Sequence, residues 1–320
     1  MKILVVRLSS IGDIFQAMTV LSDIKQYYPD CQIDWLVDKS CANVVKLSPL
    51  INNIIEIPMR EWKSSKIKFL YNLHQWKNKL TTYNYDYIID IQGLLKSAKL
   101  LNYFNGKKYG YSFFSLKEKI AYCYYNKTFR IKKHQTALNR MRELVAISLG
   151  YKINLDNPNL VLSYNKKNIL RNMDKNYIIL FHGTSKTNKE ISLDNWINLT
   201  KKLLDNYDGI ICSTYSNKQE YDFVKKLVKG VNNHRLKILD KMSFEDIVCF
   251  VDGCDFVIGV DTGFTHLASL MKKPTIGLYT NTDPELVGLN PSAISINKKI
   301  KNKNFDSNNL IDLLKEKMII

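Results

Sequence analysis

The sequence has 320 residues, 45% of them hydrophobic, so it is long enough for two packed domains. Its 47 lysine and arginine residues outnumber 30 acidic ones, and the net charge of +17 favours an anionic partner without identifying it. The apolar runs are too short to span a bilayer and no secretion signal is recognisable, so a cytoplasmic protein is expected. Six cysteines without a Cys-x-x-Cys pair fit buried thiols in a reducing compartment, and Cys249 and Cys254 are too weak a pair to indicate a zinc site.

The first half of the chain alternates short apolar strands with helical patterns. Strands are predicted at residues 3–8, 33–37, 54–57 and 85–91. A longer helix is predicted from Thr136 to Leu149, ending at Gly150. Such alternation is typical of a parallel sheet covered by helices on both faces, so residues 1–155 are predicted to form one doubly wound α/β domain.

The pattern breaks near residues 156–167 and then resumes. The predicted strands are 177–181, 209–213, 236–239, 255–260 and 275–279, and the predicted helices are 193–204, 218–228 and 243–251. Residues 156–305 are therefore predicted to form a second domain of the same class. The tail, residues 306–320, is expected to form a helix that packs back on the first domain. Ligands of such sheets bind beyond the carboxyl ends of the strands, which predicts a cleft between the two domains.

The segment from Cys254 to His266 is the most informative part of the chain. An apolar run ends in Asp261-Thr262-Gly263, and a short apolar helix pattern follows. Gly263 lets the backbone approach a ligand closely, and the first N–H groups of the helix can bind an anion such as a pyrophosphate. The pattern indicates a cradle for phosphate or a nucleotide sugar. The alternative is that Asp261 or Thr262 only caps the helix and that His266 is a core residue.

A second pattern, Arg7-Leu8-Ser9-Ser10-Ile11-Gly12-Asp13, places a carboxylate directly after the first strand. Asp13 then stands on a glycine-containing turn that opens a helix. Two interpretations follow from the residues alone: Asp13 caps the helix, or it is a general base that projects into the cleft.

Five motifs in the same order resemble one family. They are Ser9 to Asp13, Asp90 to Ala98, Arg140 to Leu144, Val260 to His266, and Thr282 to Pro284. This sequence is similar to the lipopolysaccharide heptosyltransferases, glycosyltransferase family 9, over nearly its whole length, and is closest to the heptosyltransferase I branch. The resemblance implies a GT-B fold of two Rossmann-like domains and an inverting transfer of L-glycero-D-manno-heptose from ADP-heptose to Kdo of lipid A. It implies no metal and no other cofactor, and the chain has no Asp-x-Asp pair at a strand end.

The resemblance also assigns residues to the donor. Asp13 matches the catalytic base, and Lys189 matches the lysine that binds the donor diphosphate and supports catalysis. Glu220 matches a glutamate on the ribose, with Asp222 as a rival. The other donor-binding residues implied are Thr184, Ser185, Asp261, Thr262, Gly263 and His266. His182 lies outside these motifs and is interpreted as a packing residue at a strand end.

Positive side chains are assigned to the acceptor, whose carboxylates and phosphates need fixed cations. The acceptor-binding residues implied are Ser10, Gly12, Arg60, Lys63, Lys96, Arg140 and Arg142. Residues 106–111 and 124–127 mix basic and aromatic side chains, a mixture suited to the membrane interface. They predict peripheral association with the cytoplasmic face of the inner membrane, although such mixtures are also ordinary in a chain rich in lysine and tyrosine.

Two alternatives stay open at this point. One is heptosyltransferase II, or another family 9 enzyme with a different acceptor. The other is a nucleotide-binding or nucleic-acid-binding protein without catalysis, although recognised nucleic-acid-binding signatures are absent. A binding protein of that kind would not need Asp13, Lys189 and the Asp261 loop in one site.

Overall fold

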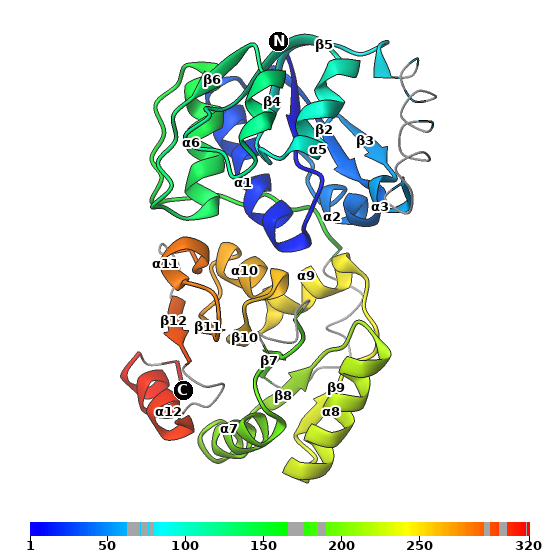
Figure 1. Cartoon of the computed structure of the whole chain (residues 1–320). Coiled ribbons are helices and arrows are strands. Elements are labelled where there is room, and N and C mark those ends of the chain that lie inside the picture. Colours follow the sequence, from blue (N-terminus) through cyan, green and yellow to red (C-terminus); the bar gives the residue numbers. More distant parts are fainter. Residues whose placement is uncertain are drawn as a thin grey trace. The chain divides into compact units, whose positions relative to one another are not determined.

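A computed structural model describes residues 1–62, 71, 76, 78, 80–165, 176–184, 190–290, 295–300, 306–317 and 319–320. The chain divides into two compact units, Met1–Ser163 and Tyr164–Ile320 (Figure 1). Within the described residues, every helix is too short or too polar to span a bilayer.

The first unit is built on a six-stranded parallel sheet with the order β3-β2-β1-β4-β5-β6. Its strands are β1 (Lys2–Val6), β2 (Gln32–Asp38), β3 (Asn53–Ile57), β4 (Asn84–Asp90), β5 (Asn105–Tyr111) and β6 (Lys127–Phe129). The central strand β1 is apolar, and its residues Ile3 to Val6 are fully buried. A continuous apolar strand of this kind fits a parallel sheet covered on both faces.

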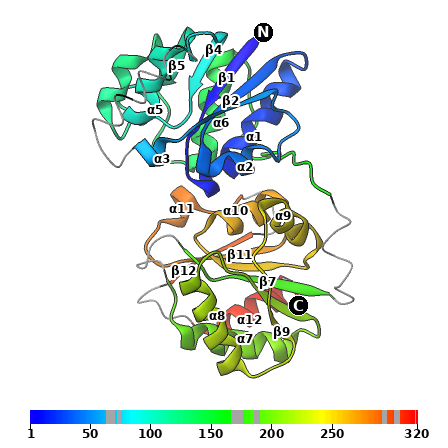
Figure 2. The same cartoon turned by 90° about the vertical axis from the view of Figure 1, so that its right-hand side faces the viewer.

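Helices cover both faces of this first sheet. They are α1 (Ile11–Tyr27), η1 (Lys39–Cys41), α2 (Ala42–Val45), α3 (Met59–Trp62), α5 (Leu95–Leu100), η2 (Leu101–Tyr103), η3 (Lys119–Tyr124) and α6 (Ala137–Leu149). Helices α1 and α6 pack together on one face, and α5 lies on the other (Figure 2). The predicted ends of α6 are confirmed: the Thr136 side chain accepts the N–H of Asn139, and Gly150 ends the helix with a left-handed φ of 81°.

The second unit repeats this architecture. Its six-stranded sheet has the order β12-β11-β10-β7-β8-β9, and all its pairs are parallel. The strands are β7 (Tyr177–Phe181), β8 (Ile210–Ser213), β9 (Leu236–Ile238), β10 (Val257–Val260), β11 (Thr275–Tyr279) and β12 (Ser295–Lys299). In both units the first and fourth strands are central neighbours, which creates the point where strand order reverses and ligands bind.

Helices also cover both faces of the second sheet. They are α7 (Leu193–Asn206), α8 (Lys218–Val231), α9 (Phe244–Gly253), α10 (Gly263–Leu270), α11 (Pro284–Val287) and α12 (Ser307–Glu316). Helices α7, α8 and α12 lie on one face of the sheet, and α9 and α10 lie on the other (Figure 2). The doubly wound α/β prediction is therefore confirmed for both halves of the chain.

The carboxyl-terminal helix differs from its prediction. Helix α12 packs against α7, and its residues Leu310, Ile311 and Leu314 belong to the core of the second unit. The apolar face of α12 is buried in the same core as Leu199 and Leu203 of α7, so the helix covers the second sheet. The expectation that this helix packs on the first domain is wrong.

The boundary between the units also lies later than residue 155. The Ser22 hydroxyl donates to the carbonyl oxygen of Asn159 at 2.5 Å, and the Ser163 N–H donates to the carbonyl oxygen of Leu47 at 2.8 Å. These bonds hold residues 156–163 on the first unit. Helical and strand periodicity could not show this, because the segment forms neither element.

Candidate active site

Asp13 lies at the carboxyl edge of the first sheet, in the first turn of α1. Three donors reach one oxygen of its carboxylate, Oδ2: the Arg7 guanidinium at 2.8 Å, the Ser10 N–H at 3.1 Å and the Ser10 hydroxyl at 2.8 Å. Among the described residues no donor reaches Oδ1, and the side chain is 36% exposed. The fold therefore holds one oxygen and leaves the other able to accept a proton.

Two opposing influences act on the pKa of Asp13. Burial raises it, whereas the Arg7 charge and the hydrogen bonds from Ser10 lower it, and the net direction is downward. Asp13 is therefore ionised at neutral pH. Arg7 is the residue that sequence reasoning missed here, and its place at the end of β1, six residues before Asp13, is the signal that could have found it.

A buried carboxylate organises the loop that follows the neighbouring strand β4. Asp90 is fully buried and accepts the N–H groups of Gln92 and Gly93 and the hydroxyls of Ser97 and Tyr125. Burial raises the pKa of Asp90, and the four donors oppose that rise. Such a fully bonded carboxylate fixes the start of α5.

This loop reaches the Asp13 turn through two contacts. Gln92 Oε1 accepts the N–H of Leu8 at 2.8 Å, and Lys96 Nζ lies 3.3 Å from the Ser9 hydroxyl oxygen. Lys96 thus stands beside the turn that carries Ser10, Gly12 and Asp13, as predicted for a residue of one site.

Two further arginines lie near this edge. Arg60 is exposed on α3. Burial raises the pKa of the Cys41 thiol, and the positive charges of Arg60 and Lys96 both lower it. Arg140 donates to the carbonyl oxygen of Ser115 at 2.8 Å, and its guanidinium lies 5.3 Å from the centre of the Tyr111 ring. Both arginines can contribute positive charge to the carboxyl edge of the sheet.

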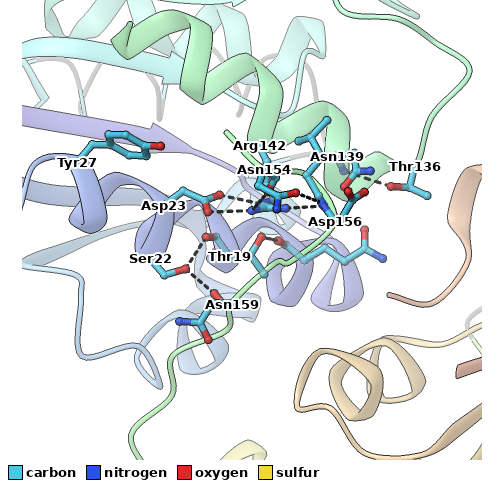
Figure 3. A network of polar contacts seen from close by, with 12 residues as sticks. Thr19, Ser22, Asp23, Tyr27, Thr136, Asn139, Arg142, Asn154, Asp156 and Asn159 are labelled. Carbon is cyan, nitrogen blue, oxygen red and sulfur yellow. Dashed lines mark hydrogen bonds and ion pairs between the residues drawn. The ribbon is translucent and has the colours of Figure 1, made fainter. Parts of the chain in front are cut away.

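Arg142 does not fit its predicted acceptor-binding role. Its side chain is 1% exposed and forms a two-pronged ion pair with Asp23 at 2.8 and 2.9 Å (Figure 3). Two more of its N–H groups donate to the carbonyl oxygens of Asn154 and Leu155. Arg142 therefore ties α6 to α1 and to the segment after α6, and four of its five N–H donors are engaged within the first unit.

The basic and aromatic segment 106–111 also differs from its prediction. All of it lies in β5, where Tyr109 and Tyr111 are only 8% and 4% exposed. Tyr125 is partly buried and bonds to Asp90. These tyrosines therefore contribute to packing within the unit.

In the second unit, the Asp261 loop joins two elements. Asp261 Oδ1 lies 3.3 Å from His266 Nε2, and its Oδ2 accepts the hydroxyl of Thr282 at 2.7 Å. Thr262 is the N-cap residue of α10, and Gly263 is its first residue. The first N–H groups of this helix have no partner within it, so they are available to an anion.

Glu220 lies against the end of β7. A Cβ atom built on Gly183 would come within 2.7 Å of the Glu220 carboxyl carbon, so only glycine fits there without displacing Glu220. The Glu220 Oε2 atom accepts the N–H and the hydroxyl of Ser216 at 2.6 and 2.8 Å. Asp222 is exposed two residues further along α8. Of the two rivals, Glu220 is the one positioned at the carboxyl edge of the sheet.

Two buried polar atoms at this edge lack partners among the described residues. They are His182 Nε2 and Thr184 Oγ1. The His182 ring stacks on Phe223 at 4.8 Å, its Nδ1 lies 3.2 Å from the Ser213 hydroxyl, and burial lowers its pKa to about 4. His182 is therefore neutral at pH 7, and its burial and stacking on Phe223 fit the packing interpretation.

Three predicted site residues, Lys63, Ser185 and Lys189, lie outside the described residues. In the described part of the chain, no group of three or more histidine, cysteine or acidic side chains is placed to hold a metal ion. The described residues that were predicted to bind the donor lie after β7, β8 and β10, and Thr282, the partner of Asp261, lies after β11. The residues around Asp13 cluster after β1 and β4.

Comparison with known proteins matches this architecture. A family model described as glycosyltransferase family 9 (heptosyltransferase) matches residues 73–315. Lipopolysaccharide heptosyltransferase 1 of Escherichia coli strain K12 is 31% identical over 294 residues, 90% of each chain. The structure of E. coli heptosyltransferase WaaC with ADP superimposes with a TM-score of 0.86 at 28% identity, covering 99% of both chains. The same enzyme with ADP-2-deoxy-2-fluoro heptose gives a TM-score of 0.85, and the fold is thus of the GT-B type.

Proposed function

Because the chain belongs to glycosyltransferase family 9, we propose that it transfers L-glycero-D-manno-heptose from ADP-heptose to Kdo of lipid A. The observation that carries this proposal is the Asp13 carboxylate, anchored through Oδ2 and open at Oδ1. A carboxylate held in this way can act as a general base.

The proposed step is a single displacement with inversion at the anomeric carbon. The acceptor hydroxyl oxygen forms the new bond to that carbon, and Asp13 Oδ1 takes the hydroxyl proton. The bond to the donor diphosphate breaks, and ADP leaves with its electron pair. Because ADP leaves as an anion, it needs positive charge more than a proton, and no metal is part of the proposal.

The donor is proposed to bind at the carboxyl edge of the second sheet. Glu220 would accept the ribose hydroxyls, a bond type that suits a carboxylate. The N-terminus of α10, at Thr262 and Gly263, would face the diphosphate together with Thr184, Ser185 and Lys189. Asp261 and His266 hold each other within this loop. The solved WaaC complexes with ADP and an ADP-heptose analogue support a donor of this kind.

The acceptor is proposed to bind at the carboxyl edge of the first sheet. Lys96, Arg60, Lys63 and Arg140 would contact its carboxylates and phosphates, because fixed cations bind such groups well. Lipid A is an anchored acceptor, so the enzyme would work at the cytoplasmic face of the inner membrane. Arg142 is no longer part of this proposal.

One experiment tests the reaction itself. Purified protein, ADP-heptose and deacylated Kdo-lipid A are incubated in EDTA, and the product is followed by mass and by the anomeric signals in NMR. We expect full transfer under chelation and an inverted anomeric centre. Strict dependence on Mg²⁺ or Mn²⁺, or retention of configuration, contradicts the proposed mechanism. Activity only on an acceptor that already carries a heptose identifies a heptosyltransferase II instead.

A matched pair of variants tests the donor site. We expect Glu220→Gln to weaken ADP binding about tenfold or more, because hydrogen bonds to a charged group contribute about 1.5–3 kcal/mol. Asp222→Asn, two residues away and exposed, should change binding less than twofold. Titration calorimetry with ADP measures both. The reverse ranking would transfer the ribose role to Asp222.

A further inference from the structure

Exposed apolar side chains gather in the connection between β5 and β6. Phe113, Phe114, Ile120 and Tyr122 are 41%, 69%, 67% and 44% exposed, and we call them the aromatic patch. The Phe113 ring meets Phe114 and Tyr122 nearly at right angles, with centroids 5.6 and 6.4 Å apart. Contacting rings at the surface form a continuous apolar area, which is typical of an interaction site.

The exposure of this patch is built into the local structure. The N–H of Ser115 donates to the carbonyl oxygen of Ser112, and the Ser115 hydroxyl bonds to both the N–H and the carbonyl oxygen of Ile131 at 2.8 Å. The two phenylalanines lie between these anchored serines. On the other side, Leu116 and Ala121 are buried. The backbone is thus fixed from within while the patch side chains project outward.

Positive charge lies beside the patch and along the segment that carries it. Residues 112–133 contain one acidic side chain, Glu118, whose carboxylate accepts the N–H of Leu95. The ammonium of Lys119 lies 4.8 Å from the Phe113 ring centre, and the Arg130 guanidinium lies 5.7 Å from that of Phe114. The exposed basic residues of this range are Lys117, Lys119, Lys127, Arg130, Lys132 and Lys133.

We propose that the aromatic patch docks on the surface of an anionic lipid bilayer. Aromatic rings favour the headgroup level, and nearby lysine and arginine residues are attracted by anionic lipid. A second copy of the chain fits less well, because it would bring two sets of six cations together. The inference deepens the proposed function, since it supplies the contact that a transferase acting on a lipid-anchored acceptor needs.

Vesicle co-sedimentation tests this docking without donor or acceptor. The full chain is mixed with vesicles of phosphatidylcholine alone or with 30 mol% phosphatidylglycerol. We expect binding to the anionic vesicles to exceed binding to neutral ones at least tenfold. Phe113→Ser combined with Phe114→Ser should lower it at least tenfold, and Lys117→Glu combined with Lys119→Glu should do the same. The matched controls are Ile147→Ser, an apolar residue 42% exposed on α6, and Lys226→Glu with Lys229→Glu on α8.

The possible results distinguish failure of the docking proposal from failure of the proposed function. Equal loss in the control variants, or no preference for anionic vesicles, overturns the proposal. A wild-type dimer in sedimentation that the Phe113/Phe114 variant abolishes would assign the patch to self-association instead. Transfer to the soluble deacylated acceptor should be unchanged in the Phe113/Phe114 variant. Failure of that transfer in the wild type would contradict the proposed function but leave the vesicle result intact.

Discussion

Replacement of Asp13 by asparagine should lower kcat by about 100-fold or more, the effect expected on loss of a positioned base. Asparagine keeps the size of the side chain and can still accept hydrogen bonds from Ser10. It cannot take up the proton of the acceptor hydroxyl. The dissociation constant of ADP should stay within twofold, because the residues proposed to bind the donor belong to the second unit. Steady-state kinetics and calorimetry measure the two quantities.

The pH profile distinguishes a base from a helix cap. The pKa of Asp13 is held below its ordinary value, so the acid limb of kcat/KM should lie below the range of an ordinary aspartate. Loss of activity there requires protonation of the carboxylate. Arg7→Met removes the ion pair and should shift this limb to higher pH. Near-normal turnover in Asp13→Asn would leave Asp13 with a capping role only.

The largest loss of stability is expected from Arg142→Met. The variant leaves the Asp23 carboxylate buried without its charge partner and frees the carbonyl oxygens of Asn154 and Leu155. Removal of one partner from a buried ion pair costs about 3–5 kcal/mol of unfolding free energy. Urea unfolding should show this loss, and hydrogen exchange should localise it to the first unit.

Two controls accompany this variant. The pair of Lys46 and Glu56 is more exposed, with side chains 53% and 33% accessible, so Lys46→Ala should cost less than about 1 kcal/mol. Arg142→Met combined with Asp23→Leu should recover much of the loss, because an apolar pair of similar volume can replace a buried ion pair. If Arg142→Met instead raised KM for the acceptor at unchanged stability, the acceptor-binding prediction would regain its support.

Apolar periodicity located the central strands but not the polar ones. Strands β7 and β11 begin and end at the predicted residues, because each is a continuous buried run between polar turns. Strands β5, β6 and β12 were missed. They are rich in lysine, asparagine and tyrosine, and their place in the sheet comes from pairing with a neighbouring strand. Pairing of this kind lies outside what local sequence encodes.

The candidate site shows the same division. Strand-end motifs placed Ser10, Asp13 and the Asp261 loop at carboxyl edges, since the doubly wound order fixes those edges, whereas Lys96 was assigned by the family resemblance. The motif containing Arg140 and Arg142 was misleading. Residues two apart on a helix point about 200° away from each other, so the two arginines cannot serve one surface. The Arg142 side chain points inward because it pairs with the buried Asp23, which lies 119 positions away in the sequence.

The core position of α12 has a consequence for the nascent chain. The first unit is a contiguous segment, so it can fold on the ribosome once Ser163 has emerged. The second unit needs Leu310, Ile311 and Leu314 to close its core beside α7. We therefore expect the second unit to fold last. Expression fragments that stop before α12 should contain a folded first unit joined to an insoluble second unit.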